Sequence, residues 1–293
     1  MPYAHNGDVD LYYETFGAHS DAALLLVNGL GSQSINYADP WCEKFAAEGF
    51  VVIRFDNRDV GLSTKFADFA PDLRGVVRAK AEGREPHAPY TVHDMADDAI
   101  AVLDAAGVAR AHVMGLSMGG MIVQTLAIDH PERLLSMTSV MSTTGDTDVG
   151  QPTHEAQKLF MAKAPTDREG YIERHLANLR TWGSPAHYDE DRLRANAATA
   201  FDRCFLPAGQ ARQSMAIAAG DSRTAALREV RVPTLVLHGS EDKLIDPSGG
   251  RRTAEAIPGA RFVLLDGMGH DYPPAYWDQI VQLVTKHARA AVS

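Results

Sequence analysis

Cysteine is scarce in this chain, and the scarcity excludes two kinds of protein. The 293 residues contain only Cys42 and Cys204, which are too few for the disulfide framework of a small secreted domain or for a zinc cluster. No two histidines or cysteines have the H-x-x-H or C-x-x-C spacing that is typical of metal ligands. We therefore expect neither a metal nor an organic cofactor, and we expect both cysteines to be buried as small apolar residues.

Positive charge is also in short supply. The chain has 28 Lys and Arg against 38 Asp and Glu, a formal net charge of -10. A protein that binds nucleic acid or an anionic membrane needs a basic surface to neutralise phosphates. The charge balance therefore predicts no nucleic-acid or membrane partner, and the surplus of acid favours solubility.

Long apolar runs are missing as well. No stretch approaches the roughly 20 apolar residues that span a bilayer, so we expect no membrane span. The first eight residues contain no basic segment followed by an apolar one, which is the pattern of a secretory signal. These absences predict a cytoplasmic protein, and nothing in the sequence indicates an oligomeric state.

Short apolar runs are present, and they alternate with helical patterns at both ends of the chain. Continuous apolar runs are typical of strands buried on both faces, and apolar residues spaced three or four apart are typical of helices. The expected strands cover residues 9–16, 22–27, 51–56, 111–114, 134–140, 233–238 and 261–265. The expected helices cover residues 41–48, 91–106, 118–130, 155–163, 168–180, 189–203, 249–257 and 274–289. This alternation predicts an α/β fold with a mostly parallel sheet and helices on both faces.

The alternation is interrupted between residues 142 and 225, where helical patterns occur without any strand-like run. We expect residues 142–225 to be a helical cap inserted into a core formed by residues 1–141 and 226–293. Ligands of open α/β sheets bind at the carboxyl ends of the strands. The cap is therefore predicted to lie above those ends.

Residues 115–120 read G-L-S-M-G-G between a predicted strand and a predicted helix. In that position G-x-S-x-G indicates a nucleophile elbow, a tight turn that exposes the hydroxyl of Ser117. The three glycines relieve crowding where the turn is tight and the helix packs closely. The backbone N–H of Met118 lies at the start of the helix, where it can stabilise a developing oxyanion.

A serine nucleophile needs a base, an acid that orients the base, and a second oxyanion donor. His270 follows the last predicted strand in a loop with two glycines, and it is the expected base. Three carboxylates, Glu241, Asp242 and Asp246, follow the preceding strand and are all candidates for the acid. The loop after residues 22–27 begins Asn28-Gly29, which makes the N–H of Leu30 the candidate second donor.

These motifs resemble those of the α/β-hydrolase superfamily over nearly the whole chain. The resemblance is carried by G-L-S-M-G-G at 115–120, H-G-S-E-D at 238–242, G-M-G-H at 267–270 and R-F-D-N-R-D-V-G-L-S at 54–63. It implies the α/β-hydrolase fold, and it implies that Asp242 is the acid. Within the superfamily the chain is similar to bacterial carboxylesterases and to the aclacinomycin methylesterase group. The resemblance also assigns Asp56 and Arg58 structural roles, and it differs at Asn28, where many members have histidine.

The expected function is that of a serine hydrolase, a carboxylic ester hydrolase that forms an acyl-enzyme on Ser117. The resemblance implies that the partner is a small-molecule ester, medium-sized and apolar, and nothing in the sequence selects a particular ester. The same triad also serves cofactor-free perhydrolases, C–C bond hydrolases and acyltransferases, because the fold does not determine the reaction. A non-catalytic binding protein with this fold is a further alternative, although such a protein has no need of all three triad members.

Large apolar residues of the cap have two possible roles. They could line an acyl pocket or simply pack the cap onto the core, and packing is the interpretation we favour for most of them. The residues concerned are Phe160, Met161, Tyr171, Trp182, Tyr188, Phe201, Phe205, Met215 and Ile217.

Overall fold

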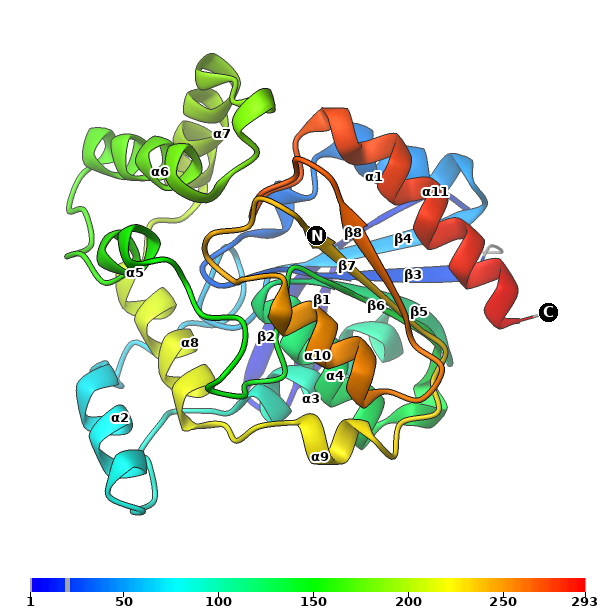
Figure 1. The fold of residues 1–293 in the computed structure, drawn as a ribbon, viewed down its shortest axis with the longest axis horizontal. Coiled ribbons are helices and arrows are strands. Elements are labelled where there is room, and N and C mark those ends of the chain that lie inside the picture. Colours follow the sequence, from blue (N-terminus) through cyan, green and yellow to red (C-terminus); the bar gives the residue numbers. More distant parts are fainter. Residues whose placement is uncertain (1, 19–21, 293) are drawn as a thin grey trace.

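The computed structural model describes residues 2–18 and 22–292, and within them the strands form one eight-stranded sheet (Figure 1). The strand order is β1-β2-β4-β3-β5-β6-β7-β8. Pairs β1–β2 and β2–β4 are antiparallel, and the pairs from β4 to β8 are parallel. The strands are β1 (Tyr3–Asn6), β2 (Val9–Phe16), β3 (Ala22–Val27), β4 (Phe50–Phe55), β5 (Ala111–Leu116), β6 (Leu134–Val140), β7 (Thr234–Gly239) and β8 (Arg261–Leu265). The predicted α/β-hydrolase architecture is therefore confirmed, while β1, which is short and mostly polar, is missing from the predicted set.

Helices cover both faces of this sheet. Figure 1 shows α1 and α11 on one side and α3, α4 and α10 on the other. The helices are α1 (Asp39–Ala47), α2 (Leu73–Ala81), α3 (Val92–Ala105), α4 (Met118–Asp129), α5 (His154–Phe160), α6 (Arg168–Trp182), α7 (Glu190–Arg203), α8 (Pro207–Ala219), α9 (Thr224–Leu227), α10 (Ser248–Ala256) and α11 (Pro274–Ala291). Short 3-10 turns occupy Ser34–Asn36, Pro131–Arg133 and Pro185–His187. The sequence did not predict α2, α8 or α9.

The apolar runs are continuous because each strand contributes to two cores. Leu25 and Val27 of β3 belong to the cluster under α3 and α4, whereas Leu24 and Leu26 belong to the cluster under α1 and α11. Successive side chains of a strand point to opposite faces, so a strand covered on both sides can be apolar along its whole length.

Helices α5 to α8 all fall between β6 and β7 in the chain. Figure 1 shows α5, α6 and α7 grouped beside the sheet, on the side away from the C-terminus. Helices α6 and α7 share a small apolar cluster of their own, made of Ile172, Leu176, Leu193 and Ala197. Helix α8 differs because its Ala216 belongs to a core cluster. We accordingly propose the division given above, a cap of residues 142–225 on a core of residues 1–141 and 226–293.

The two cysteines are free thiols in different surroundings. Cys42 is fully buried in the cluster under α1 and α11, and burial raises the pKa of its thiol to about 12. Cys204 is only partly buried, so the expectation of burial was wrong for it. The reason is its position just after α7, outside the cap's apolar cluster.

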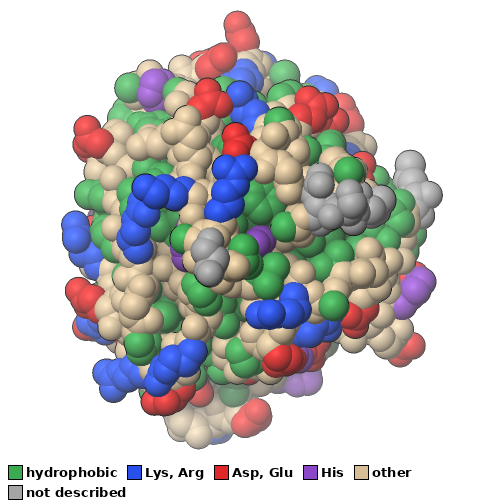
Figure 2. Space-filling model, turned by 90° about the vertical axis from the view of Figure 1, so that its right-hand side faces the viewer, with side chains coloured by type: hydrophobic (Ala, Val, Ile, Leu, Met, Phe, Trp, Pro, Cys, Tyr) green, Lys and Arg blue, Asp and Glu red, His purple; other side chains and the backbone are tan. Residues whose placement is uncertain are grey.

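The surface carries charges of both signs. On the face shown in Figure 2, basic side chains are interspersed with acidic, apolar and uncharged ones. Among the residues that the structure describes, no helix combines the length and the apolar character that crossing a membrane requires.

Candidate active site

Ser117 lies in the turn between β5 and α4 and has an unusual backbone conformation, with φ 55° and ψ -117°. Positive φ is uncommon for a residue other than glycine and costs on the order of 1–3 kcal/mol. The Ser117 N–H donates to the Val140 carbonyl at 2.9 Å, and the Ser142 hydroxyl donates to the Ser117 carbonyl at 2.8 Å. These two bonds hold the strained turn from either side.

The glycines around Ser117 are required by close contacts. A Cβ on Gly115 would lie 2.0 Å from the Gly119 carbonyl oxygen, and a Cβ on Gly119 would lie 2.0 Å from the Val27 carbonyl oxygen. The elbow therefore packs backbone against backbone, as the G-x-S-x-G pattern predicts.

His270 lies in the loop after β8, beside Ser117. Its Nε2 is 3.0 Å from Ser117 Oγ, and its Nδ1 is 2.7 Å from Asp242 Oδ2. Gly267 has φ 73° and makes the loop turn. The structure thus brings the side chains of Ser117, Asp242 and His270 into one hydrogen-bonded chain.

Asp242 is buried in the turn after β7 and is held by two backbone donors. Its Oδ1 accepts the N–H groups of Leu244 and Ile245, each at 2.9 Å. Burial by itself raises the pKa of the Asp242 carboxyl, but the charge of His270 and hydrogen bonds from His238 and His270 lower it to about 2. The group is therefore ionised at neutral pH.

The two other candidate acids lie elsewhere. Glu241 and Asp246 are both exposed. Asp246 accepts a hydrogen bond from the N–H of Ser248 at the start of α10. Of the three carboxylates after β7, Asp242 is the one that the structure brings to His270.

His238 is a buried neighbour of the triad that sequence reasoning did not single out. Its Nε2 is 2.8 Å from the Ile245 carbonyl oxygen and 3.2 Å from Asp242 Oδ2. A carbonyl oxygen only accepts, so Nε2 carries the proton and can donate to both oxygens. His238 lies at the end of β7, four residues before Asp242. That spacing alone does not distinguish a histidine that bonds to Asp242 from any other buried histidine.

The loop after β3 passes directly beside Ser117. A Cβ on Gly29 would lie 3.3 Å from Ser117 Cβ and 3.9 Å from Ser117 Oγ. The loop is held by the Gly31 N–H, which donates to Gln213 Oε1 at 2.8 Å, and by the Ser32 N–H, which donates to the Gly29 carbonyl at 3.2 Å. Leu30 lies between Gly29 and Gly31, the two residues whose backbone groups make these bonds. Its N–H remains the predicted second oxyanion donor. Met118 is the first residue of α4, so its N–H lies at the positive end of the helix.

Asp56 and Arg58, after β4, have supporting contacts. The Asp56 carboxylate accepts the N–H groups of Ser34 and Leu62 and pairs with Arg203 of α7 at 2.7 Å. The Arg58 guanidinium pairs with Asp98 of α3 at 2.6 Å. Asp56 therefore links the loops after β3 and β4 to α7, and Arg58 links the loop after β4 to α3.

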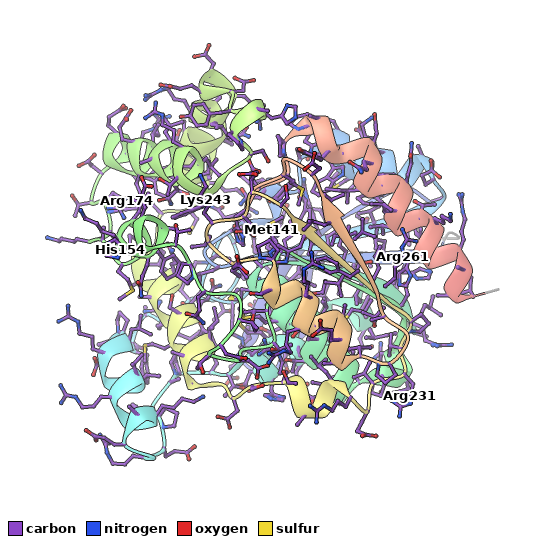
Figure 3. The ribbon with its side chains drawn as sticks, in the orientation of Figure 1. Met141, His154, Arg174, Arg231, Lys243 and Arg261 are labelled. Atoms are coloured by element: carbon purple, nitrogen blue, oxygen red, sulfur yellow. The ribbon has the colours of Figure 1, made fainter. Side chains whose placement is uncertain are left out.

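The turn after β7, which carries Asp242, lies close to the first helices of the proposed cap. Figure 3 shows Met141 and Lys243 between the sheet and the helices that carry His154 and Arg174. The Lys243 carbonyl accepts the N–H of Thr153, the residue that caps α5, at 2.9 Å. The start of the cap is therefore tied to the turn that carries Asp242.

The large apolar residues of the cap have several environments. The rings of Tyr171, Phe201 and Phe205 pack against one another in tilted and edge-on arrangements. Trp182 is buried. Phe160 and Met161 are 40% and 63% exposed, so these two are exceptions to the packing role expected for most of the set.

Comparisons with known proteins agree with this arrangement. A family model described as alpha/beta hydrolase fold matches residues 22–272. Rhodomycin D methylesterase DauP of Streptomyces sp. (strain C5) is 33% identical, over 97% of this chain and 96% of the relative. Rhodomycin D methylesterase DnrP of Streptomyces peucetius is 32% identical, over 98% and 97%. Among solved structures, the enol-lactonase from Burkholderia xenovorans LB400 has a TM-score of 0.75 and 26% identity, covering 98% of this chain and all of the other. The two methylesterases agree with the predicted class of enzyme, a carboxylic ester hydrolase.

Proposed function

The chain belongs to the α/β-hydrolase fold family, and from its site we propose that it is a serine hydrolase that cleaves carboxylic esters through an acyl-enzyme on Ser117. The observation that carries the proposal is the continuous hydrogen-bonded chain from Asp242 through His270 to Ser117. Its two distances, 2.7 Å and 3.0 Å, lie within the range for transfer of a proton between nucleophile and base.

In the proposed reaction Ser117 Oγ attacks the ester carbonyl carbon while His270 Nε2 takes the hydroxyl proton. The N–H groups of Leu30 and Met118 stabilise the negative charge that forms on the carbonyl oxygen. The bond to the alkoxy group then breaks, and His270 gives the proton to the leaving alcohol. Water, deprotonated by His270, attacks the acyl-enzyme in the second half, and the acid leaves as Ser117 regains its proton.

Asp242 supports both halves of this reaction. Its pKa of about 2 keeps it ionised, so it accepts a hydrogen bond from the Nδ1–H of His270 and leaves Nε2 free to act as base. The same negative charge stabilises the imidazolium that forms in each transition state.

The substrate class rests on the relatives rather than on the site. Two of the curated relatives, DauP and DnrP, are named rhodomycin D methylesterase. We therefore propose a methyl ester of a medium-sized, apolar acid as the first substrate to test.

The proposal predicts that Ser117→Ala and His270→Ala each lower kcat on the order of 10⁴-fold or more, because each removes an essential proton-transfer partner. Turnover of p-nitrophenyl esters of graded chain length, together with labelling by a fluorophosphonate probe, measures this. His154→Ala, which removes an exposed histidine of α5, is the matched control and keeps wild-type turnover. Near-normal turnover by a folded Ser117→Ala protein would refute the proposal.

Product analysis distinguishes hydrolysis from transfer. Hydrolysis gives the free acid whether or not an alcohol is added. An acyltransferase gives a new ester with the added alcohol, and a perhydrolase gives the peracid when hydrogen peroxide is present.

A further inference from the structure

The segment that ends α6 lies directly on the loop that carries His270. The His270 N–H donates to the Trp182 carbonyl at 2.6 Å, and the Gly269 N–H donates to Ser184 Oγ at 2.9 Å. Two successive peptide groups of the loop are therefore bonded to residues 182–184 of the cap.

Ser184 connects this contact to the residue on the other side of His270. Its N–H and its hydroxyl both donate to Asp271 Oδ1, at 3.0 Å and 2.5 Å. The hydroxyl has one proton, which it gives to Asp271, and it accepts from Gly269, so its orientation is fixed. Ser184 is 1% exposed, which means that water does not replace these bonds.

Steric contact between the two backbones is equally close. A Cβ on Gly269 would lie 2.3 Å from the Gly183 carbonyl carbon and 2.5 Å from the Trp182 carbonyl oxygen. Gly269 is not among the residues with positive φ, so its small size rather than its conformational freedom is what this position uses. Gly267, with φ 73°, thus provides the turn, and Gly269 provides the space for the close approach.

We propose that Ser184 and Asp271 are positioning residues that fix His270 through its own backbone, so that Nε2 meets Ser117 Oγ. This inference rests on the proposed function, because it assigns the pair a role in the same reaction. A displacement of about 1 Å in a catalytic group can lower a rate about 100-fold. A loop bonded on both sides of His270 to one rigid segment prevents such a displacement.

The test is Ser184→Ala, which removes the link between Gly269 and Asp271. We expect kcat to fall about 10- to 100-fold with KM changed less than about threefold, and the rate of fluorophosphonate labelling to fall by the same factor as kcat. Asp271→Ala gives the same result, whereas Asp271→Asn keeps an acceptor oxygen and restores most of kcat. Thr181→Ala is the matched control, because the Thr181 hydroxyl bonds within α6 to the Ala177 carbonyl, and it leaves kcat unchanged.

Thermal unfolding of each variant separates positioning from simple support of the cap. A lower Tm with wild-type kcat and wild-type labelling in Ser184→Ala overturns the proposal. In that case the loss of turnover in Ser117→Ala still supports the proposed function, so the two failures are distinguishable. If Ser184→Ala does not fold, Asp271→Ala is compared with Asp271→Asn instead. A higher kcat in Asp271→Asn supports the proposal, and equal kcat in the two variants overturns it.

A second measurement does not depend on turnover. The proton of His270 Nδ1, shared with Asp242, gives a downfield resonance in the proton NMR spectrum of the whole protein. A shift or broadening of this resonance in Ser184→Ala, but not in Thr181→Ala, supports the proposal even if the wild-type protein hydrolyses no ester. An unchanged resonance overturns it.

Discussion

Asp242 accepts hydrogen bonds on both carboxylate oxygens. Oδ1 is occupied by two backbone N–H groups, and Oδ2 lies within hydrogen-bonding distance of two imidazoles. Several donors to a buried carboxylate favour its charged form. The backbone donors fix the orientation of Oδ2, and His238 fills the side of Oδ2 that His270 does not use.

His238→Phe is expected to raise the pKa of Asp242, because it removes a donor that favours the ionised form. It also leaves the Ile245 carbonyl unpaired. We expect kcat at neutral pH to fall about tenfold, because Asp242 loses a donor that fixes its orientation toward His270. His238→Gln retains a donor and recovers most of kcat. Steady-state rates at pH 7 measure the effect, and equal kcat for all three proteins would contradict the role given to His238.

Ser117 stores strain in its positive φ. Glycine adopts this conformation without a steric penalty, but alanine does not. Ser117→Gly is therefore expected to be more stable than Ser117→Ala by about 1 kcal/mol, although both are inactive. Urea unfolding of the two variants gives the difference, and equal stabilities would show that the turn is relaxed.

At the scale of elements, α8 connects the loops that follow β3 and β4. Gln213 accepts from the Gly31 N–H and donates to the Arg58 carbonyl, each at 2.8 Å. Arg212 forms a bidentate pair with Asp59 at 2.8 Å and 2.7 Å, and both groups are buried. Helix α8 therefore supports the loop that carries Leu30 while it packs against the core.

Gln213→Leu is expected to destabilise the fold by about 1–3 kcal/mol, because the buried Arg58 carbonyl and the partly buried Gly31 N–H lose their partner. We also expect kcat to fall about tenfold, since the loop that carries Leu30 loses an anchor. The control is Gln157→Leu, at an exposed position of α5. Urea unfolding and ester turnover give the two quantities. If kcat stayed at the wild-type value while stability fell, Gln213 would support the fold alone.

Local pattern predicted most elements but not α8. The strand at 22–27 was found because it is apolar at every position. Helix α8 buries Arg212 and Gln213, so it lacks the apolar stripe by which an amphipathic helix is recognised. Polar residues are buried here because each finds a partner on a distant loop.

The residues of the candidate site likewise fall into those that the sequence predicts and those that it does not. The motif at 115–120, the turn at 238–242 and the loop at 267–270 lie directly after strands, and their order in the chain could be predicted. Ser184, Asp271 and Gln213 could not be predicted, because a serine, an aspartate or a glutamine becomes specific only when two distant segments meet. These contacts depend on how residues 142–225 pack against the rest of the chain, and no local sequence pattern predicts that packing.

At the scale of the whole molecule, the cap contacts the loops after β3, β4 and β8. Gln213 bonds to Gly31, Arg203 pairs with Asp56, and Ser184 bonds to Gly269. The first and third of these loops carry the predicted oxyanion donor Leu30 and the predicted base. The proposed cap thus supports the loops of the candidate site.

His112 gives the whole fold a dependence on pH. It lies in the middle of the sheet on β5, 3% exposed, with Nδ1 2.8 Å from Ser136 Oγ. Burial, with a contribution from the charge of His287, lowers the pKa of His112 to about 4. In the unfolded chain the histidine pKa is about 6.5. Between these values the unfolded state binds more protons, so the stability of the fold decreases as the pH falls from about 6.5 to about 4.

The size of this effect is about 2–3 kcal/mol, from roughly 1.4 kcal/mol per unit of pKa difference. His112→Gln cannot bind the proton, so its free energy of unfolding should fall less between pH 7 and 4.5 than that of the wild type, even if the variant is less stable at pH 7. His175, whose pKa burial also lowers to about 4, keeps part of the dependence. Asp242 contributes in a separate window below pH 4, where its carboxylate becomes protonated. Urea unfolding at half-unit steps of pH gives both slopes. If the free energies of unfolding of the two proteins changed with pH in parallel, His112 would bind its proton equally well in the folded and the unfolded state.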